Sequence, residues 1–219
     1  MDLTGDERLK HNYHELTDFE RIYYLALLRP GWSEDDRFFF EGDRGLIGQM
    51  FLAERKALYA TILQFRPARC FEVGTFSGGG STFFFASALR EVGAGQLITL
   101  ESNEVWYLLG AQYDKTYLPE LSAHTRVVHA NRAELVAPFL PPEGVDCFFL
   151  DGAEDGDQSW REFEFFSRHL RSGTVMMAHD WNSEKMRRVR PAVEADPQWE
   201  EVLRLEPPDS VGFVVYVRR

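Results

Sequence analysis

The chain has 219 residues, with 24 Lys and Arg against 35 Asp and Glu, which gives a formal net charge of −11 at pH 7. This length predicts one globular body with a single well-made core, and a content of 44% hydrophobic and 27% charged residues argues against a disordered or fibrous protein. The acidic balance disfavours nucleic acid as a partner, because phosphate binding draws on clustered Lys and Arg.

The sequence also predicts neither a membrane segment nor a disulfide framework. No uninterrupted apolar stretch reaches the roughly 18 residues that a bilayer-spanning helix needs, and residues 1–18 lack the apolar core of a signal peptide. Cys70 and Cys147 each begin an apolar, strand-like run, so we expect buried free thiols. We therefore expect a cytoplasmic protein with no membrane partner.

The first 45 residues differ in pattern from the rest of the chain. A capping-box sequence at residues 17–20 begins an apolar stripe with helical spacing that ends before Pro30. A polar loop follows, which contains Trp32 and three consecutive phenylalanines at 38–40. Nothing here predicts a sheet strand, so we expect residues 1–45 to form a helical cap. That cap would be a lid over a pocket or an arm in a homodimer, and simple cover for the sheet is the alternative.

Strand and helix signals then alternate to the C-terminus. After a helix expected at 45–64, the strand-like runs are 70–73, 96–100, 126–129, 145–150 and 174–178, and the helical runs are 81–92, 103–116 and 159–171. Strands separated by helices imply right-handed crossovers and a parallel sheet that is covered on both faces. The last two runs, 199–205 and 211–217, are joined by too few residues for a crossover and should be antiparallel. The sequence thus predicts an α/β fold with a seven-stranded, mostly parallel sheet and a C-terminal antiparallel hairpin.

Ligands of such sheets bind at the carboxyl ends of the strands, where this chain places a glycine-rich turn and an acid. The turn at residues 74–80 lets the backbone approach a ligand closely. Phe76 breaks the dinucleotide fingerprint, and no Lys follows to make a P-loop. Glu101 ends the second strand, where a carboxylate can accept both hydroxyls of a ribose. Together they indicate an adenosine derivative, although a tight turn and a solvated carboxylate are the alternatives.

Several of these runs resemble the motifs of class I S-adenosylmethionine-dependent methyltransferases. Residues 71–82 are similar to that family's first motif and residues 97–101 to its second, whereas 146–152 and 170–181 resemble the small bacterial and catechol-type O-methyltransferases. The resemblance implies a Rossmann-like methyltransferase domain over residues 46–219. It also implies S-adenosyl-L-methionine as cofactor and a small-molecule acceptor, with a hydroxyl as the expected methylated group.

The resemblance further implies a cofactor site at the strand ends. Its residues would be Glu72, Gly74, Thr75, Gly78, Gly79, Ser81, Glu101, Ser102, Asn131 and Asp151. The glycine turn and the helix that follows it would bind the methionine end, since helix N-terminal amides attract a carboxylate. Glu101 would hold the ribose, and Asn131 would lie beside the adenine.

Asp151 and Asp180 form a second group of candidate residues. Each follows a core strand, and neighbouring parallel strands would bring them close together. Paired carboxylates suit a hard divalent cation such as Mg²⁺, and the resemblance agrees, because catechol-type members bind metal at corresponding positions. Alternatively, Asp151 orients the cofactor amine and Asp180 caps a loop.

His179, directly before Asp180, is the candidate general base. Its unperturbed pKa of about 6.5 suits proton removal from an acceptor, and Asp180 would orient the ring as its catalytic partner. A metal ligand or a hydrogen-bonding support is the alternative role for His179. The acidic run 154–157 is expected to be a solvated loop, with metal binding or substrate contact as its alternatives.

The leading hypothesis is a methyltransferase acting on a small apolar or aromatic acceptor, because the surface is acidic and the N-terminal segment is aromatic. One alternative is a non-catalytic nucleoside-binding protein of the same fold. Another is a nicotinamide-dependent oxidoreductase, which Phe76 and the terminal hairpin disfavour.

Overall fold

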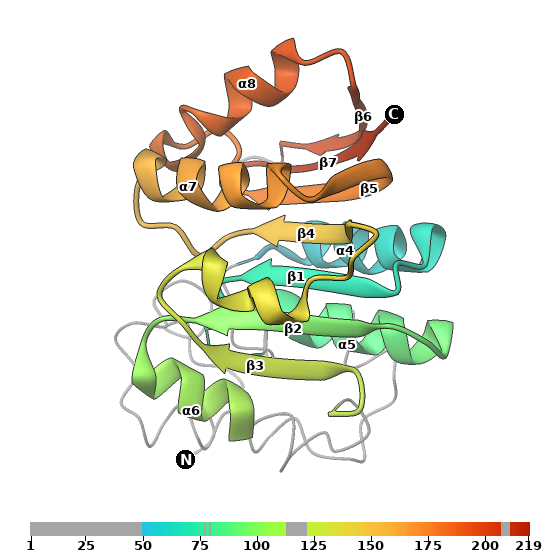
Figure 1. Cartoon of the computed structure of the whole chain (residues 1–219), viewed down its shortest axis with the longest axis vertical. Coiled ribbons are helices and arrows are strands. Elements are labelled where there is room, and N and C mark those ends of the chain that lie inside the picture. The colour runs from blue at the N-terminus through green and yellow to red at the C-terminus, as the bar shows by residue number, and fades with distance from the viewer. Residues whose placement is uncertain (1–49, 77, 79, 113–121, 207–210) are drawn as a thin grey trace.

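The computed structural model describes residues 50–219 except for 77, 79, 113–121 and 207–210 (Figure 1). The cap expected at residues 1–45 lies outside the described residues, together with its Trp32 and the phenylalanines at 38–40. The expectations for that segment stay predictions.

Within the described residues, the strands form one seven-stranded sheet. They are β1 (Arg69–Val73), β2 (Gln96–Glu101), β3 (Thr125–His129), β4 (Val145–Leu150), β5 (Leu170–His179), β6 (Trp199–Leu205) and β7 (Phe213–Arg218). Their order is β3-β2-β1-β4-β5-β7-β6. Neighbours from β3 to β5 are parallel, whereas β7 is antiparallel to both β5 and β6. The predicted sheet and its C-terminal hairpin are confirmed.

Helices cover both faces of this sheet. The longer ones are α4 (Leu52–Phe65), α5 (Ser81–Val92), α6 (Glu104–Gln112), α7 (Gly156–Ser167) and α8 (Val189–Ala195). Two 3-10 helices join them, η4 (Ala133–Phe139) and η5 (Glu184–Met186). Figure 1 shows α4 and α5 behind the sheet and α7 in front of it. None of the described helices is long and apolar enough to cross a membrane.

The core lies in two layers, because alternate side chains of the central strands point to opposite faces. On β4, Cys147 and Phe149 pack in the layer that contains α4 and α5, whereas Phe148 and Leu150 pack in the layer with α7 and α8. Strands buried on both faces are apolar throughout, which is why residues 145–150 form an unbroken apolar run. Cys147 lies opposite Cys70 of β1, and both are buried free thiols as predicted.

The helix predicted at 159–171 is wrong at both ends. It begins at Gly156, because the Asp155 side chain accepts hydrogen bonds from the backbone amides of Asp157 and Gln158, both at 2.8 Å. It ends at Ser167, and β5 already begins at Leu170, which pairs with Val145 of β4. The acidic run 154–157 is therefore partly the cap and first turn of α7 and not only a solvated loop.

Candidate functional site

A cavity of about 400 Å³ lies at the carboxyl ends of β1, β2 and β4. The strand order reverses at this point, since β1 lies between β2 and β4, and such a switch point is where doubly wound sheets bind ligands. Most of the predicted cofactor residues line the cavity, namely Gly74, Thr75, Ser81, Glu101, Ser102, Asn131 and Asp151. Gly79 lies outside the described residues. The structure therefore brings together in one cavity residues from four strand ends.

The glycine turn after β1 is hydrogen-bonded to the end of β2 and lies close to the end of β4. Gly74 has a φ of +102°, and a Cβ at this position would lie 2.7 Å from the Cα of Gly152. The backbone amides of Gly74 and Thr75 both donate to the carbonyl of Leu100 at 3.0 Å. Gly74 is thus needed because the ends of β1 and β4 approach each other there, and this close approach shapes the cavity floor.

Glu101 is held rigidly at the cavity wall. Its carboxylate accepts a hydrogen bond from the backbone amide of Asn103 at 2.8 Å and another from Phe76 at 2.7 Å, one on each oxygen. Burial raises the pKa of this carboxyl, and the two amide hydrogen bonds act in the opposite direction. Each carboxylate oxygen keeps a further lone pair for a ligand. The side chain can therefore accept from two vicinal hydroxyls without moving.

Two predicted cofactor residues lie elsewhere. Glu72 is completely buried and does not line the cavity, and its carboxylate accepts a hydrogen bond from the Thr82 hydroxyl at 2.6 Å. Burial raises the pKa of Glu72 to about 7. Gly78, with φ +85°, donates its amide to the carbonyl of Thr75 at 3.0 Å. Neither Glu72 nor Gly78 lines the cavity, and a role for either residue in cofactor binding stays a prediction.

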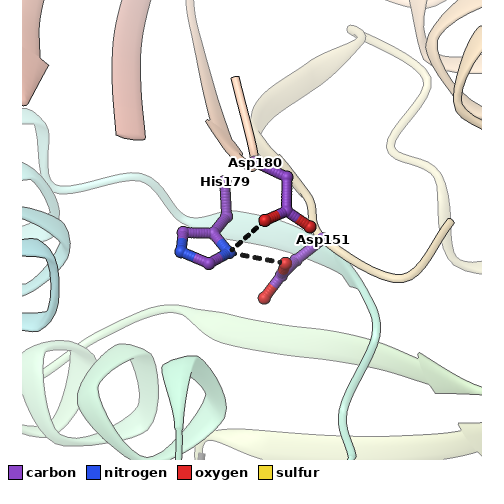
Figure 2. Close-up of side chains that lie close together, drawn as sticks. All are labelled: Asp151, His179 and Asp180. Carbon is purple, nitrogen blue, oxygen red and sulfur yellow. Dashed lines mark hydrogen bonds and ion pairs between the residues drawn. The ribbon is translucent and has the colours of Figure 1, made fainter. Parts of the chain in front are cut away.

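Asp151, His179 and Asp180 meet at the ends of β4 and β5 (Figure 2). Nδ1 of His179 lies 3.1 Å from Oδ1 of Asp151 and 3.5 Å from Oδ1 of Asp180. One potential ligand atom from each of the three residues lies within 4.8 Å of the others. The expected convergence of the two aspartates is therefore confirmed, with the His179 ring beside them.

Two charged residues of this cluster were missed by the sequence reasoning. Glu54 of α4 is completely buried, and its Oε2 lies 3.2 Å from Nε2 of His179. Nζ of Lys185, in η5, lies 2.8 Å from Oδ2 of Asp180 and also lines the cavity. An acid on the apolar stripe of the helix at 45–64 was a usable signal for Glu54. Lys185 offered none, because it lies in a polar segment.

The surroundings of His179 decide its charge. Burial lowers the pKa of the imidazole, but the nearby carboxylates of Asp151, Glu54 and Asp180 outweigh burial and raise this pKa well above its ordinary value. His179 is therefore expected to be protonated at neutral pH, with one N–H group directed to the aspartates and the other to Glu54. In that state neither ring nitrogen has a lone pair free to accept a proton.

The sheet order is that of the Rossmann-like fold found in solved O-methyltransferase structures. A family model described as a methyltransferase domain matches residues 71–181, which is about half of the chain. The chain therefore belongs to this methyltransferase family, and the resemblance seen in its motifs is confirmed.

Solved structures share the fold at low sequence identity. The O-methyltransferase from Bacillus cereus in complex with SAH is 19% identical, with a TM-score of 0.64, and the match covers 78% of this chain and 83% of that one. The O-methyltransferase TomG from Streptomyces achromogenes, in complex with SAM, is 18% identical with a TM-score of 0.64 and coverages of 91% and 96%. The SAH-bound methyltransferase PaMTH1 from Podospora anserina is 16% identical with a TM-score of 0.58 and coverages of 96% and 92%. No curated protein matches the sequence significantly.

Proposed function

We propose that this methyltransferase uses S-adenosyl-L-methionine to methylate a hydroxyl group of a small molecule. The observation that carries the proposal is the Glu101 carboxylate, fixed by two backbone amides in a cavity that also contains the glycine turn. A ribose diol is the ligand that such a carboxylate suits best. The cofactor-bound O-methyltransferases of the same fold support this assignment.

The methionine end of the cofactor would lie against the N-terminus of α5. Gly80 is the N-cap of this helix and offers no side chain to satisfy the first amides. Gly80 and Ser81 both line the cavity. Free amides at a helix N-terminus attract an anion, so the methionine carboxylate would bind there while Glu101 holds the ribose.

The methyl group is carried by the cofactor as a sulfonium, and direct transfer to an acceptor oxygen needs mainly alignment from the protein. The edge formed by Asp151, Asp180 and Lys185 would receive the acceptor hydroxyl, because Asp151 and Lys185 line the same cavity. Removal of the hydroxyl proton is assigned to the His179–Asp180 pair. The Asp180 carboxylate would accept the proton, and the protonated His179 ring beside it would hold that carboxylate in place.

A divalent cation such as Mg²⁺ fits the same residues. One candidate ligand atom from each of Asp151, His179 and Asp180 lies within 4.8 Å of the others, and carboxylate oxygens are the ligands that Mg²⁺ prefers. A cation at this point would be held by Asp151 and Asp180, with His179 as a further ligand once Nδ1 is deprotonated. When bound, it would supply positive charge that favours the deprotonated acceptor.

The acceptor is proposed to be apolar or aromatic, and nucleic acid is disfavoured by the net charge of −11. Residues 1–45 would cover the pocket as a lid or link two copies as a dimer arm, next to a methyltransferase domain over residues 46–219. The homodimer and the cytoplasmic location stay predictions.

The test is a methyl-transfer assay with S-adenosylmethionine and a panel of phenols and aliphatic alcohols. We expect equal amounts of S-adenosylhomocysteine and methyl ether, and a large loss of turnover in His179→Ala with the affinity for S-adenosylhomocysteine nearly unchanged. EDTA should abolish turnover, and added Mg²⁺ should restore it. Binding of S-adenosylhomocysteine without turnover on any acceptor would favour the non-catalytic alternative. Turnover that is unchanged by EDTA would show that no divalent cation is needed.

A further inference from the structure

Glu162 is a buried acid that the proposed function leaves without a role. It lies on α7, is 5% exposed, and contributes to the cavity wall. Its Oε1 accepts a hydrogen bond from Nε2 of Gln158 at 3.0 Å. Its Oε2 is buried and has no hydrogen-bond partner among the described residues. A buried carboxylate oxygen without a partner is unfavourable, so a ligand group that completes its hydrogen bonding is expected here.

The neighbouring Gln158 fixes how this acid is presented. Its amide oxygen accepts a hydrogen bond from the backbone N–H of Glu154 at 3.2 Å, which directs its NH₂ group to Glu162. Both side chains line the cavity from the same helix, one turn apart. Toward a ligand, Glu162 therefore presents Oε1, which already accepts from Gln158, and Oε2, which has no partner among the described residues.

The protonation state of Glu162 suits a ligand that both donates and accepts. Burial raises the pKa of its carboxyl to about 7, although the hydrogen bond from Gln158 and the charges of Arg161 and Lys185 act against this, and Glu134 acts with it. A substantial neutral fraction is thus present at neutral pH. A neutral carboxyl group offers an O–H donor beside a carbonyl acceptor.

The topology indicates which part of the cofactor reaches this wall. Glu101 at the end of β2 would hold the ribose, and the glycine turn after β1 would receive the methionine end. A base on the side of the ribose away from the glycine turn would meet residues 130–133 after β3 and helix α7, which line the cavity there. Helix α7 packs against η4 at this place, and both contribute to the cavity wall. Adenine carries a 6-amino donor next to the N1 acceptor, which is the complement of a neutral carboxyl group.

We propose that Glu162 recognises the adenine of the cofactor, accepting a hydrogen bond from the 6-amino group and donating one to N1. Gln158 positions the carboxyl group for this contact. The inference rests on the proposed use of S-adenosylmethionine. Because Gln158 donates to Oε1, the neutral carboxyl group keeps its proton on Oε2. In this arrangement it matches adenine and opposes a 6-oxopurine, whose N1 carries a hydrogen and whose 6-position is only an acceptor.

The experiment compares the affinities of S-adenosylhomocysteine and S-inosylhomocysteine by calorimetry at pH 6, where the Glu162 carboxyl group is mostly neutral. The wild type should prefer the adenosine compound by about 10-fold or more. Glu162→Gln keeps one donor and one acceptor and should bind S-adenosylhomocysteine within about threefold of the wild type. Glu162→Leu removes both and should lose about 10- to 100-fold in affinity together with the preference for adenine. Glu164→Gln, an exposed acid on the same helix, is the control that should change neither.

The outcomes separate the two proposals. If the wild type binds S-adenosylhomocysteine but shows no preference over the 6-oxo compound, the role of Glu162 is wrong and the proposed function stands. The same holds if Glu162→Leu keeps both affinity and preference. If the wild type binds neither nucleoside, the proposed function fails and this inference fails with it. Should the Leu variant not fold, a wild type without preference for the adenosine compound, or a large loss of affinity in Glu162→Gln, would still overturn the role of Glu162.

Discussion

Glu101 cannot turn away from the cavity, because backbone amides on both sides, from Phe76 and Asn103, hold its two oxygens. Replacing it with Ala would leave a pair of ribose hydroxyls without an acceptor inside the cavity. We expect Glu101→Ala to weaken S-adenosylhomocysteine binding about 10- to 100-fold, from the ~1–3 kcal/mol that an unsatisfied buried group costs. Calorimetry measures this directly, with the exposed Glu104→Ala as a matched control. Equal affinities of the two variants for S-adenosylhomocysteine would show that Glu101 does not contact the cofactor.

Glu72 predicts a pH dependence of stability. Burial disfavours the charged form and raises the pKa of this carboxyl group from its ordinary value of 4.5 to about 7 in the fold. A folded-state pKa that is raised gives stability that is complete below the unfolded pKa and is lost as the pH rises through the folded one. Glu72→Gln should therefore match the wild type near pH 4.5 and be the more stable protein at pH 8, by about 3 kcal/mol at most.

Urea unfolding at a series of pH values measures this difference. Glu143→Gln, at an exposed loop position, should show no such crossover. A constant difference between Glu72→Gln and the wild type across the range would mean that Glu72 is already ionised in the fold.

At the level of elements, the approach of β1 to β4 depends on a pair of glycines. A Cβ on Gly74 would meet the backbone of Gly152 at 2.7 Å, and its φ of +102° is unfavourable for any other residue. Gly74→Ala should therefore separate the two strand ends, lower the stability by several kcal/mol and abolish nucleoside binding. Gly93→Ala is the matched control, because Gly93 also has a positive φ, +77°, but nothing lies within 4 Å of its Cβ position.

The control should cost only about 1 kcal/mol for its backbone conformation and leave binding intact. Thermal unfolding and calorimetry on both variants test this. Similar losses in the two proteins would show that the conformation of the glycine, and not the contact with Gly152, is what matters.

Most of the secondary-structure elements, but not all of their ends and contacts, could be predicted from the sequence. Strand–helix alternation and the short connection between the last two strands correctly predicted the sheet and the hairpin. The start of β5 was predicted wrongly because Leu170 is in a strand through its pairing with Val145 of β4. The two residues are distant in sequence, so no local pattern reveals this pairing. Glu54 was missed as a partner of His179 for the same reason, since 125 residues separate the two.

In the whole molecule, several of the acidic side chains gather at the carboxyl edge of the sheet. Glu101, Asp151 and Asp180 lie at strand ends, as the sequence indicated, whereas the Glu72 side chain is buried against Thr82 at the start of α5. The sequence could place residues at strand ends because parallel strands share one carboxyl edge. It could not predict which of those side chains reach the cavity, because that depends on packing between elements.

The central claim is that this carboxyl edge binds a cofactor of the S-adenosylmethionine type, and its most direct test is calorimetry of S-adenosylhomocysteine and of NAD with the wild-type protein. We predict that S-adenosylhomocysteine binds at one site per chain and that NAD produces no heat of binding. Binding of NAD together with no binding of S-adenosylhomocysteine would contradict the account.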